Sequence, residues 1–215
     1  MVAVKIISAI ALAYMVGSLP MGVMIGRFIY KKDIRQYGSG NTGMANAYRT
    51  LGPSGGVIVL AADIAKGAVA VTIPRLLFFP VEFPSTSLPV NVVISLCGLA
   101  AIFGASYSIF LKFSGGKSVG ASAGVIISLF PYTIPFLFGL WLAVVALTRY
   151  ISAGAIAISL AFPILVLLFY PGHPELVAAT VIFAVLIIYR HRSNIVRLLN
   201  GTERRFYLSP KKEES

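Results

Sequence analysis

A glycine-rich segment, Gly38-Ser-Gly-Asn-Thr-Gly43, lies between two arginines, Arg35 and Arg49. Three glycines in six residues let the backbone turn successive N–H groups toward an anion. Ser39 and Asn41 add polar side chains, and an arginine guanidinium suits phosphate because it can donate two parallel hydrogen bonds. The segment predicts a phosphate site, with a flexible connecting loop as the alternative.

A second segment, Ser114-Gly-Gly-Lys-Ser118, stands directly before a predicted helix. The first N–H groups of a helix attract anions, so Lys117 is a second candidate phosphate ligand. The segment resembles the end of a nucleotide-binding P-loop, but that motif needs a glycine where this chain has Leu111. The pattern favours a phosphate group over a nucleotide. A lysine that only marks the cytoplasmic side of a membrane is the alternative.

A histidine flanked by two arginines, in Arg190-His-Arg192, is expected to stay neutral because both charges oppose its protonation. A neutral imidazole can accept a hydrogen bond or act as a base, although basic residues are also routine after a final membrane span. The segment Arg149-Tyr-Ile-Ser152 is interpreted as an interfacial anchor in which Ser152 caps the next helix.

Two ionisable residues, Asp63 and Lys66, are three apart within an apolar stretch and would share one helix face. Such residues inside a span are costly and indicate function, but pairing with each other explains them equally well. Two histidines and one cysteine cannot form a zinc site, and no GxSxG elbow occurs. We therefore predict neither a metal nor a cofactor.

The composition indicates a membrane protein. Of the 215 residues, 58% are hydrophobic and only 12% charged, against about half and about a quarter in soluble domains. The net charge of +11 would suggest nucleic acid in a soluble protein. Here it first suggests cytoplasmic loops or an anionic substrate, and no nucleic-acid partner is expected.

Seven apolar stretches are predicted to form transmembrane helices, for which about 20 residues are needed per crossing. Pro131 and Pro135 divide the longest apolar run into two of them. The stretches cover residues 6–27, 55–79, 91–111, 118–130, 134–148, 152–169 and 175–189.

The distribution of basic residues orients these helices. With the N-terminus outside, the inner segments 27–53, 112–118, 149–151 and 190–215 hold 15 of the 18 Lys and Arg, as the positive-inside rule requires. The sequence thus predicts an all-α, polytopic integral membrane bundle of seven transmembrane helices with a cytoplasmic C-terminus. It would comprise one domain over residues 1–206 and a polar basic cytoplasmic tail over 207–215.

Taken together, the motifs resemble the PlsY family of bacterial membrane enzymes, over residues from about 10 to 206. They occur in order along the chain as Gly17-Ser-Leu-Pro20, Asp33-Ile-Arg35, Gly38-Ser-Gly-Asn41, Arg49-Thr-Leu-Gly52, Asp63-Ile-Ala-Lys66-Gly67, Phe113-Ser-Gly-Gly-Lys117, Arg190-His-Arg-Ser-Asn194-Ile and Gly201-Thr-Glu203.

The resemblance implies a multi-pass acyltransferase of phospholipid synthesis in the bacterial inner membrane, with its site on the cytoplasmic side. It would move a fatty acyl group from acyl-phosphate to the 1-hydroxyl of sn-glycerol 3-phosphate, giving lysophosphatidic acid and phosphate. Its partners would be those two substrates and the lipid bilayer, and it would act as a monomer.

Carried over by motif, the resemblance also implies which residues form the site. The proton acceptor would be either His191 or a phosphate oxygen of the substrate. The catalytic residues would be Arg49, Lys117, His191 and Asn194, and the substrate-binding residues Ser39, Gly40, Asn41, Gly115, Gly116 and Ser152.

Two positions near the second motif depart from the usual family pattern. Ala105 stands where a histidine is usual, and Ser118 where a glycine is usual. These departures support an alternative, a non-catalytic relative that binds glycerol phosphate or phospholipid as a regulator. A phosphate-ester transporter is disfavoured because the polar groups cluster at one face instead of at the membrane midplane.

Overall fold

The computed structural model describes residues 2–78 and 90–206 of the chain. The predicted proline-rich turn after the second apolar stretch and the predicted tail at 207–215 lie outside the described residues. Within them the chain forms helices and connecting segments. The α-helices are α1 (Val2–Gly17), α2 (Met21–Phe28), α3 (Met44–Phe78), α4 (Val90–Ser106), α5 (Val119–Leu129), α6 (Ile134–Thr148), α7 (Ile151–Phe169), α8 (Pro174–Arg190) and α9 (Arg192–Leu199), with short 3-10 turns at Ile34–Gln36, Ile109–Leu111 and Pro131–Thr133.

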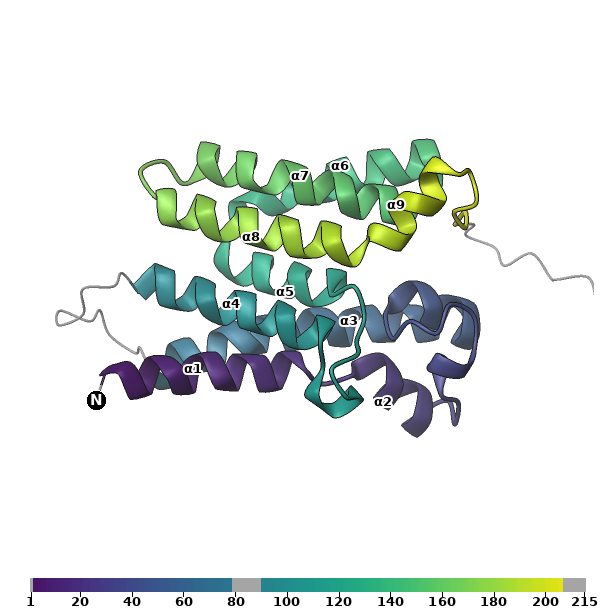
Figure 1. The fold of residues 1–215 in the computed structure, drawn as a ribbon, viewed down its shortest axis with the longest axis horizontal. Coiled ribbons are helices and arrows are strands. Elements are labelled where there is room, and N and C mark those ends of the chain that lie inside the picture. Colours follow the sequence, from purple (N-terminus) through teal and green to yellow (C-terminus); the bar gives the residue numbers. More distant parts are fainter. Residues whose placement is uncertain (1, 79–89, 207–215) are drawn as a thin grey trace, which may run out of the picture.

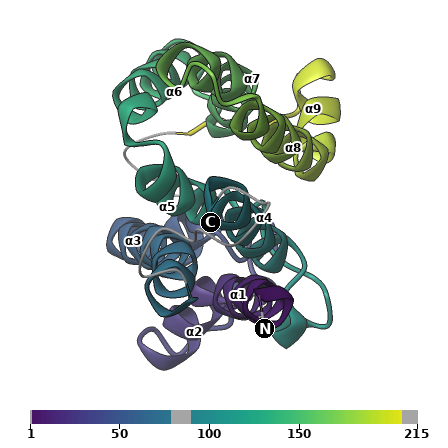
Figure 2. The same cartoon turned by 90° about the vertical axis from the view of Figure 1, so that its left-hand side faces the viewer.

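The helices form two layers (Figures 1 and 2). In one, α3 packs on α5 and α1 packs on α4; in the other, α7 lies against both α6 and α8. The contact between α4 and α8 joins the layers. Buried apolar side chains from both layers form one core, which includes Cys97, Val125, Phe162 and Phe183.

All seven predicted apolar stretches are largely helical, but their lengths differ from the prediction. By length and composition, α3, Pro131–Thr148 and α7 could each cross a membrane. The count of candidate spans rises to five if the bent pairs α1–α2 and α8–α9 each form one. The helices α4 and α5, with 17 and 11 residues, fall short of this test. The all-helical fold is confirmed, while the seven crossings and their orientation stay predictions.

The first apolar stretch is two helices that meet at 41°, as its Gly-Ser-Leu-Pro sequence indicates. Proline has no N–H to continue the hydrogen-bond ladder, so carbonyl groups before it need other donors. The Lys66 amine adds a donor at this break, to the Leu19 carbonyl oxygen at 2.8 Å, which also accepts from the Met21 N–H at 3.0 Å. Lys66 also pairs with Asp63 at 2.8 Å, which confirms that the two share a face. This buried pair therefore ties α3 to the break between α1 and α2.

The polar stretch before the second apolar run is partly helical, which the sequence did not predict. The helix α3 begins at Met44 and is kinked at Gly52, whose φ of 87° leaves the helical region directly before Pro53. The first turns of α3 are held by a small separate core in which Ala47 packs with Ile34 and Val59. Arg49 is therefore placed on a helix instead of a flexible loop.

Candidate active site

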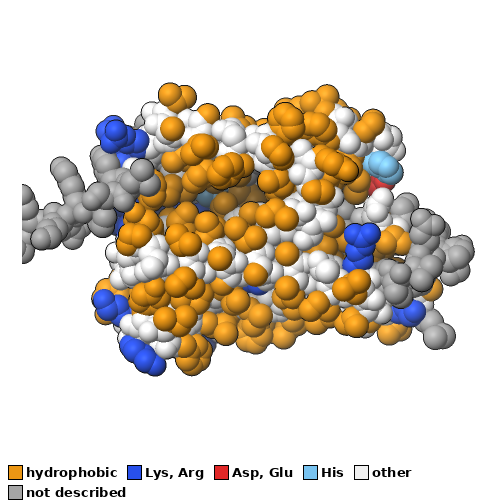
Figure 3. Space-filling model, turned by 180° about the vertical axis from the view of Figure 1, so that it is seen from behind, with side chains coloured by type: hydrophobic (Ala, Val, Ile, Leu, Met, Phe, Trp, Pro, Cys, Tyr) orange, Lys and Arg blue, Asp and Glu red, His pale blue; other side chains and the backbone are white. Residues whose placement is uncertain are grey.

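A cavity of about 810 Å³ lies between the two layers. Seen from behind, the molecule is hollowed there, and hydrophobic side chains surround the opening (Figure 3). The two glycine-rich loops and residues from the end of α8 onward line its polar end, whereas apolar side chains such as Leu137, Phe162 and Ile187 line the remainder. Of the ten predicted site residues, all except Gly40 border this cavity.

Asn46, which is buried, organises the first glycine-rich loop. Its side-chain oxygen accepts a hydrogen bond from the Ser39 N–H at 2.8 Å, and its amide donates to the Ile34 carbonyl at 2.7 Å. The Gly40 N–H donates to the Tyr37 carbonyl. The N–H groups of Ser39 and Gly40 are thus engaged by acceptors within the protein, contrary to the expectation that they point at an anion. Ser39 instead borders the cavity.

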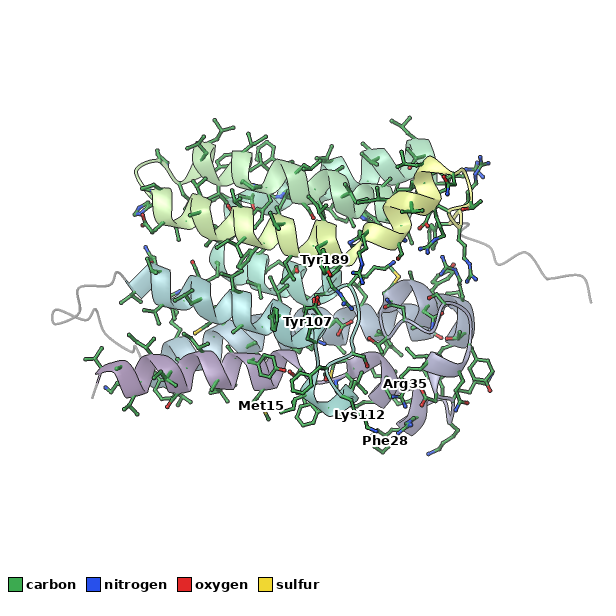
Figure 4. The ribbon with its side chains drawn as sticks, viewed as in Figure 1. Met15, Phe28, Arg35, Tyr107, Lys112 and Tyr189 are labelled. Atoms are coloured by element: carbon green, nitrogen blue, oxygen red, sulfur yellow. The ribbon has the colours of Figure 1, made fainter. Side chains whose placement is uncertain are left out.

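The second glycine-rich loop is held by an arginine. Arg190 donates to the carbonyl oxygens of Gly115 and Gly116, both at 2.9 Å from Nη2. Its guanidinium also lies 4.8 Å from the ring centre of Tyr107, and Tyr107 and Tyr189 mark the junction between the layers in Figure 4. A Cβ on Gly115 would stand 2.5 Å from the Ala105 carbonyl oxygen. Only glycine therefore allows the loop backbone to lie this close to the end of α4. Sequence reasoning gave Arg190 an effect on the charge of His191 but did not predict its contact with this loop.

Lys117 follows this loop and borders the cavity. Burial lowers the pKa of its amine to about 8; Glu203 opposes this shift and nearby arginines add to it. The next residue, Ser118, adopts a left-handed conformation with φ of 61° and hydrogen-bonds to the Ser106 hydroxyl at 2.7 Å. Lys117 is therefore partly desolvated, and an incoming anion would favour its charged form.

Glu203 joins three other polar side chains of the site. Its carboxylate accepts hydrogen bonds from Ser152 at 2.8 Å, from Asn194 at 2.6 Å and from Arg197 at 2.7 Å. Although burial opposes it, these hydrogen bonds hold the pKa of the Glu203 carboxyl below its usual range. Ser152 is thus a partner of Glu203 and not the cap of α7, because the N-cap residue is Tyr150.

Glu203 itself was not predicted as a site residue, although it ended the last motif. The sequence feature that could have identified it is an acidic residue in an otherwise basic segment. The Asn194 amide is committed to this carboxylate, and in the described part of the chain its buried Oδ1 has no donor. The side-chain oxygen of Asn194 is therefore available to accept a hydrogen bond from a ligand.

His191 lies at the junction of α8 and α9, beyond the last residue of α8, and is 2% exposed. Its Nδ1 is 2.8 Å from the Ile187 carbonyl oxygen. Since a carbonyl only accepts, Nδ1 carries the proton and Nε2 keeps its lone pair. Burial lowers the pKa of His191 to about 4, and Lys117 and Arg190 add smaller effects. The lowered pKa agrees with the expected neutrality, but burial is its largest cause, and of the two flanking arginines Arg190 contributes.

Among the described residues, no group of three or more His, Cys, Asp or Glu side chains is placed to hold a metal ion. What the cavity offers is cationic groups at one end, a neutral imidazole beside them and an apolar remainder. This arrangement suits a phosphorylated substrate together with a hydrocarbon chain.

Comparison with known proteins identifies relatives over nearly the whole chain. Residues 7–201 match the family described as glycerol-3-phosphate acyltransferase. The glycerol-3-phosphate acyltransferase of Staphylococcus carnosus is 42% identical over 202 residues, covering 92% of this chain and 96% of the relative. That of Lactiplantibacillus plantarum is 41% identical, covering 93% and 91%.

Two crystal structures of PlsY, described as an integral membrane glycerol 3-phosphate acyltransferase, have the same fold. The lysophosphatidic acid form aligns with a TM-score of 0.80 and 32% identity, over 94% of this chain and 95% of that one. The glycerol 3-phosphate form aligns with a TM-score of 0.79 at the same identity, over 94% and 96%. From the cavity, the motifs and these matches together, the chain belongs to the glycerol-3-phosphate acyltransferase family of the PlsY type.

Proposed function

We propose that this acyltransferase takes its acyl group from acyl-phosphate and transfers it to the 1-hydroxyl of glycerol 3-phosphate, forming lysophosphatidic acid and inorganic phosphate. The observation that carries the proposal is a single cavity that joins a cationic end, with Arg49 and Lys117, to an apolar part. Two phosphate groups need several cations, and a fatty chain needs the apolar part. A relative that binds glycerol phosphate alone would not need the apolar part.

The donor fits the chemistry of the site. An acyl-phosphate is already activated, so the protein has to orient the substrates and stabilise charge without forming an acyl-enzyme. In the proposed reaction the hydroxyl oxygen attacks the carbonyl carbon. The bond from that carbon to the phosphate oxygen breaks, and its electron pair leaves with the phosphate. Lys117 and Arg49 would neutralise the charge on the phosphate groups.

The hydroxyl proton has two possible acceptors, His191 and a phosphate oxygen of the substrate. Proton transfer works best when the base has a pKa near the working pH. The His191 imidazole, with its pKa of about 4, is a weaker base than a phosphate monoester, whose second pKa is about 6. We infer that the proton passes to a phosphate oxygen and that Nε2 of His191 orients the hydroxyl by accepting its hydrogen bond.

The remaining predicted residues would hold the substrates. Ser152 and Asn194, linked through Glu203, would bind the glycerol moiety, with the free Oδ1 of Asn194 as an acceptor for a hydroxyl. Gly115 and Gly116 would allow close approach of the acyl-phosphate to the backbone. The loop residues Ser39, Gly40 and Asn41 would complete the site.

The test is phosphate release and product analysis with purified protein in lipid, supplied with palmitoyl-phosphate and glycerol 3-phosphate. Release should require both substrates, yield lysophosphatidic acid by mass spectrometry and be lost in Lys117→Ala. Glycerol 3-phosphate binding without turnover would contradict the proposed donor, and a parallel reaction with palmitoyl-coenzyme A would show whether another donor is used.

We further propose a monomeric single domain with seven crossings of the bacterial inner membrane, an outside N-terminus and a cytoplasmic site. Labelling tests this orientation in a Cys97→Ser background. A membrane-impermeant thiol reagent added to intact cells should label the His173→Cys variant and should not label Lys31→Cys. The reverse pattern would overturn the orientation.

A further inference from the structure

A second hollow, of about 340 Å³, lies beside the polar end of the catalytic cavity. Three residues, Gly38, Arg49 and Arg204, border both spaces and therefore form the partition between them. We call this hollow the vestibule. Its lining residues are Lys32, Tyr37, Gly38, Arg49, Thr50 and Arg204.

The vestibule carries unbalanced positive charge. Lys32, Arg49 and Arg204 border it, and no carboxylate among the described residues does. Within the described ranges, the side chains of these three residues make neither a hydrogen bond nor an ion pair. Burial and the charge of Arg204 both lower the pKa of Arg49, and Glu203 only partly opposes them. Such a cluster gains free energy when an anion binds between the cations.

The nearest carboxylates are already engaged elsewhere. Asp33, next to Lys32 in the chain, pairs with Arg27 at 2.8 Å and with Arg35 at 2.6 Å. Glu203, next to Arg204, is held by Ser152, Asn194 and Arg197. Glu203 still attracts Arg49, but the carboxylates of the described residues do not balance all three cations, so an anion from solution can bind there.

The position and lining of the vestibule indicate which anion it takes. The hydroxyl-bearing side chain of Tyr37 also lines the vestibule, and hydroxyl and guanidinium donors together suit phosphate. The Thr50 hydroxyl already donates to the Asn46 carbonyl oxygen at 2.9 Å. An exposed hollow at the polar end is accessible from water, whereas hydrophobic side chains surround the opening between the layers (Figure 3). A small water-soluble phosphate ester is therefore the fitting ligand.

We propose that the vestibule is an entry site for glycerol 3-phosphate, which binds there through its phosphate group before passing Arg49 and Arg204 into the catalytic cavity. This inference rests on the proposed function, because it assigns a route to one of the two substrates. The acyl donor has a separate route through the apolar opening. Removing charge from the vestibule should therefore affect one substrate and not the other.

Lys32 provides the test, because it borders the vestibule and not the catalytic cavity. In nanodiscs of phosphatidylcholine, Lys32→Gln should raise the KM for glycerol 3-phosphate about three- to tenfold, as expected for one lost charge near an anion. The KM for palmitoyl-phosphate should stay unchanged. At about 0.5 M salt the difference from wild type should shrink, because exposed charges are screened.

Lys31→Gln is the matched control, since it removes the same charge from the adjacent exposed residue, which does not border the vestibule. Equal KM values for glycerol 3-phosphate in the two variants would overturn the proposal. The assay is repeated in nanodiscs containing phosphatidylglycerol. An effect of Lys32→Gln confined to these anionic membranes would mean that the vestibule holds a lipid headgroup, which also overturns the proposal.

Calorimetric titration of glycerol 3-phosphate without acyl donor separates this inference from the proposed function. Binding weakened by Lys32→Gln and not by Lys31→Gln supports the entry site even if palmitoyl-phosphate is not a donor. Binding that is equal in both variants, with normal turnover, overturns the entry site and leaves the proposed reaction intact.

Discussion

Arg190 donates two hydrogen bonds to the carbonyl oxygen of Gly116, from Nε at 3.2 Å and from Nη2 at 2.9 Å. The arginine ends α8, in one layer, and the glycine belongs to the loop before α5, in the other. The contact therefore links the layers at the polar end of the cavity. It also sets the position of Lys117, the next residue in the loop.

We expect Arg190→Lys to lower kcat/KM about tenfold to a hundredfold, because an ammonium cannot reproduce the planar fork and small displacements of a site are costly. Steady-state kinetics with both substrates would measure the loss. Arg192→Lys is the control, since the exposed Arg192 stacks on Tyr189 outside the cavity. Equal losses in the two variants would contradict a specific role for the Arg190 contact.

The pH dependence of the reaction should have a basic limb set by Lys117. Its amine is charged below a pKa of about 8 and neutral above it, so kcat/KM should fall as the pH rises through about 8. In Lys117→Arg the limb should move to higher pH because a guanidinium stays protonated. A limb that keeps its position in this variant would assign it to another group.

An acidic limb should distinguish the two candidate proton acceptors. If a substrate phosphate accepts the proton, kcat/KM should fall below about pH 6, where the phosphate dianion is lost. His191→Gln should then reduce kcat about tenfold, through lost orientation, and leave the limb in place. Loss of the limb together with a far larger drop in kcat would identify the imidazole as the base.

Replacing Glu203 by glutamine should weaken both stability and activity. Hydrogen bonds to a charged group contribute about 1.5–3 kcal/mol, so Glu203→Gln should lower the free energy of unfolding by about that amount at pH 7. The lowered pKa of Glu203 means that its contribution is complete above its unfolded pKa, about 4.3, and is lost as the pH falls through the lower folded value.

Thermal unfolding in detergent at several pH values would measure this effect. Glu175→Gln is the control because Glu175 pairs with the exposed His173. The Glu203→Gln variant should show less acid destabilisation than the wild type below pH 4. The same acid sensitivity in both proteins would contradict the role assigned to Glu203.

The buried pair of Asp63 and Lys66 should behave as a unit. Their side chains are 15% and 7% exposed, and removing one partner leaves an uncompensated charge at a cost of about 3–5 kcal/mol. Lys66→Met should therefore unfold at a much lower temperature than wild type. The double variant Asp63→Asn with Lys66→Met should recover part of the loss, and additive losses would contradict the coupling.

The sequence predicted those structural features that a single property, such as hydrophobicity, determines. Apolar stretches gave the helices because burial in lipid or protein decides them, and Pro20 marked the break between α1 and α2. The candidate site residues came from the family resemblance, and all except Gly40 border the cavity because their segments lie at the same end of the bundle. The pairing of Asp63 with Lys66 followed from helical spacing alone.

The sequence was uninformative where tertiary packing decides. Residues 74 apart make the contact between Arg190 and Gly116, and no local pattern encodes it. The hydrogen bonds of Glu203 depend in the same way on how α7 and α9 are placed. The beginning of α3 at Met44 depends on burial of Ala47, and the first loop uses its own N–H groups because Asn46 is buried beside it.

The hollow between the layers, with its hydrophobic rim (Figure 3), has a kinetic consequence. A donor that enters there arrives by diffusion in the plane of the membrane, so its effective concentration is its mole fraction among the surrounding lipids. Adding inert lipid would slow the reaction at a fixed total amount of donor, while glycerol 3-phosphate would still act through its volume concentration. The enzyme would thus sense the composition of the bilayer through one substrate and the metabolic state of the cytoplasm through the other.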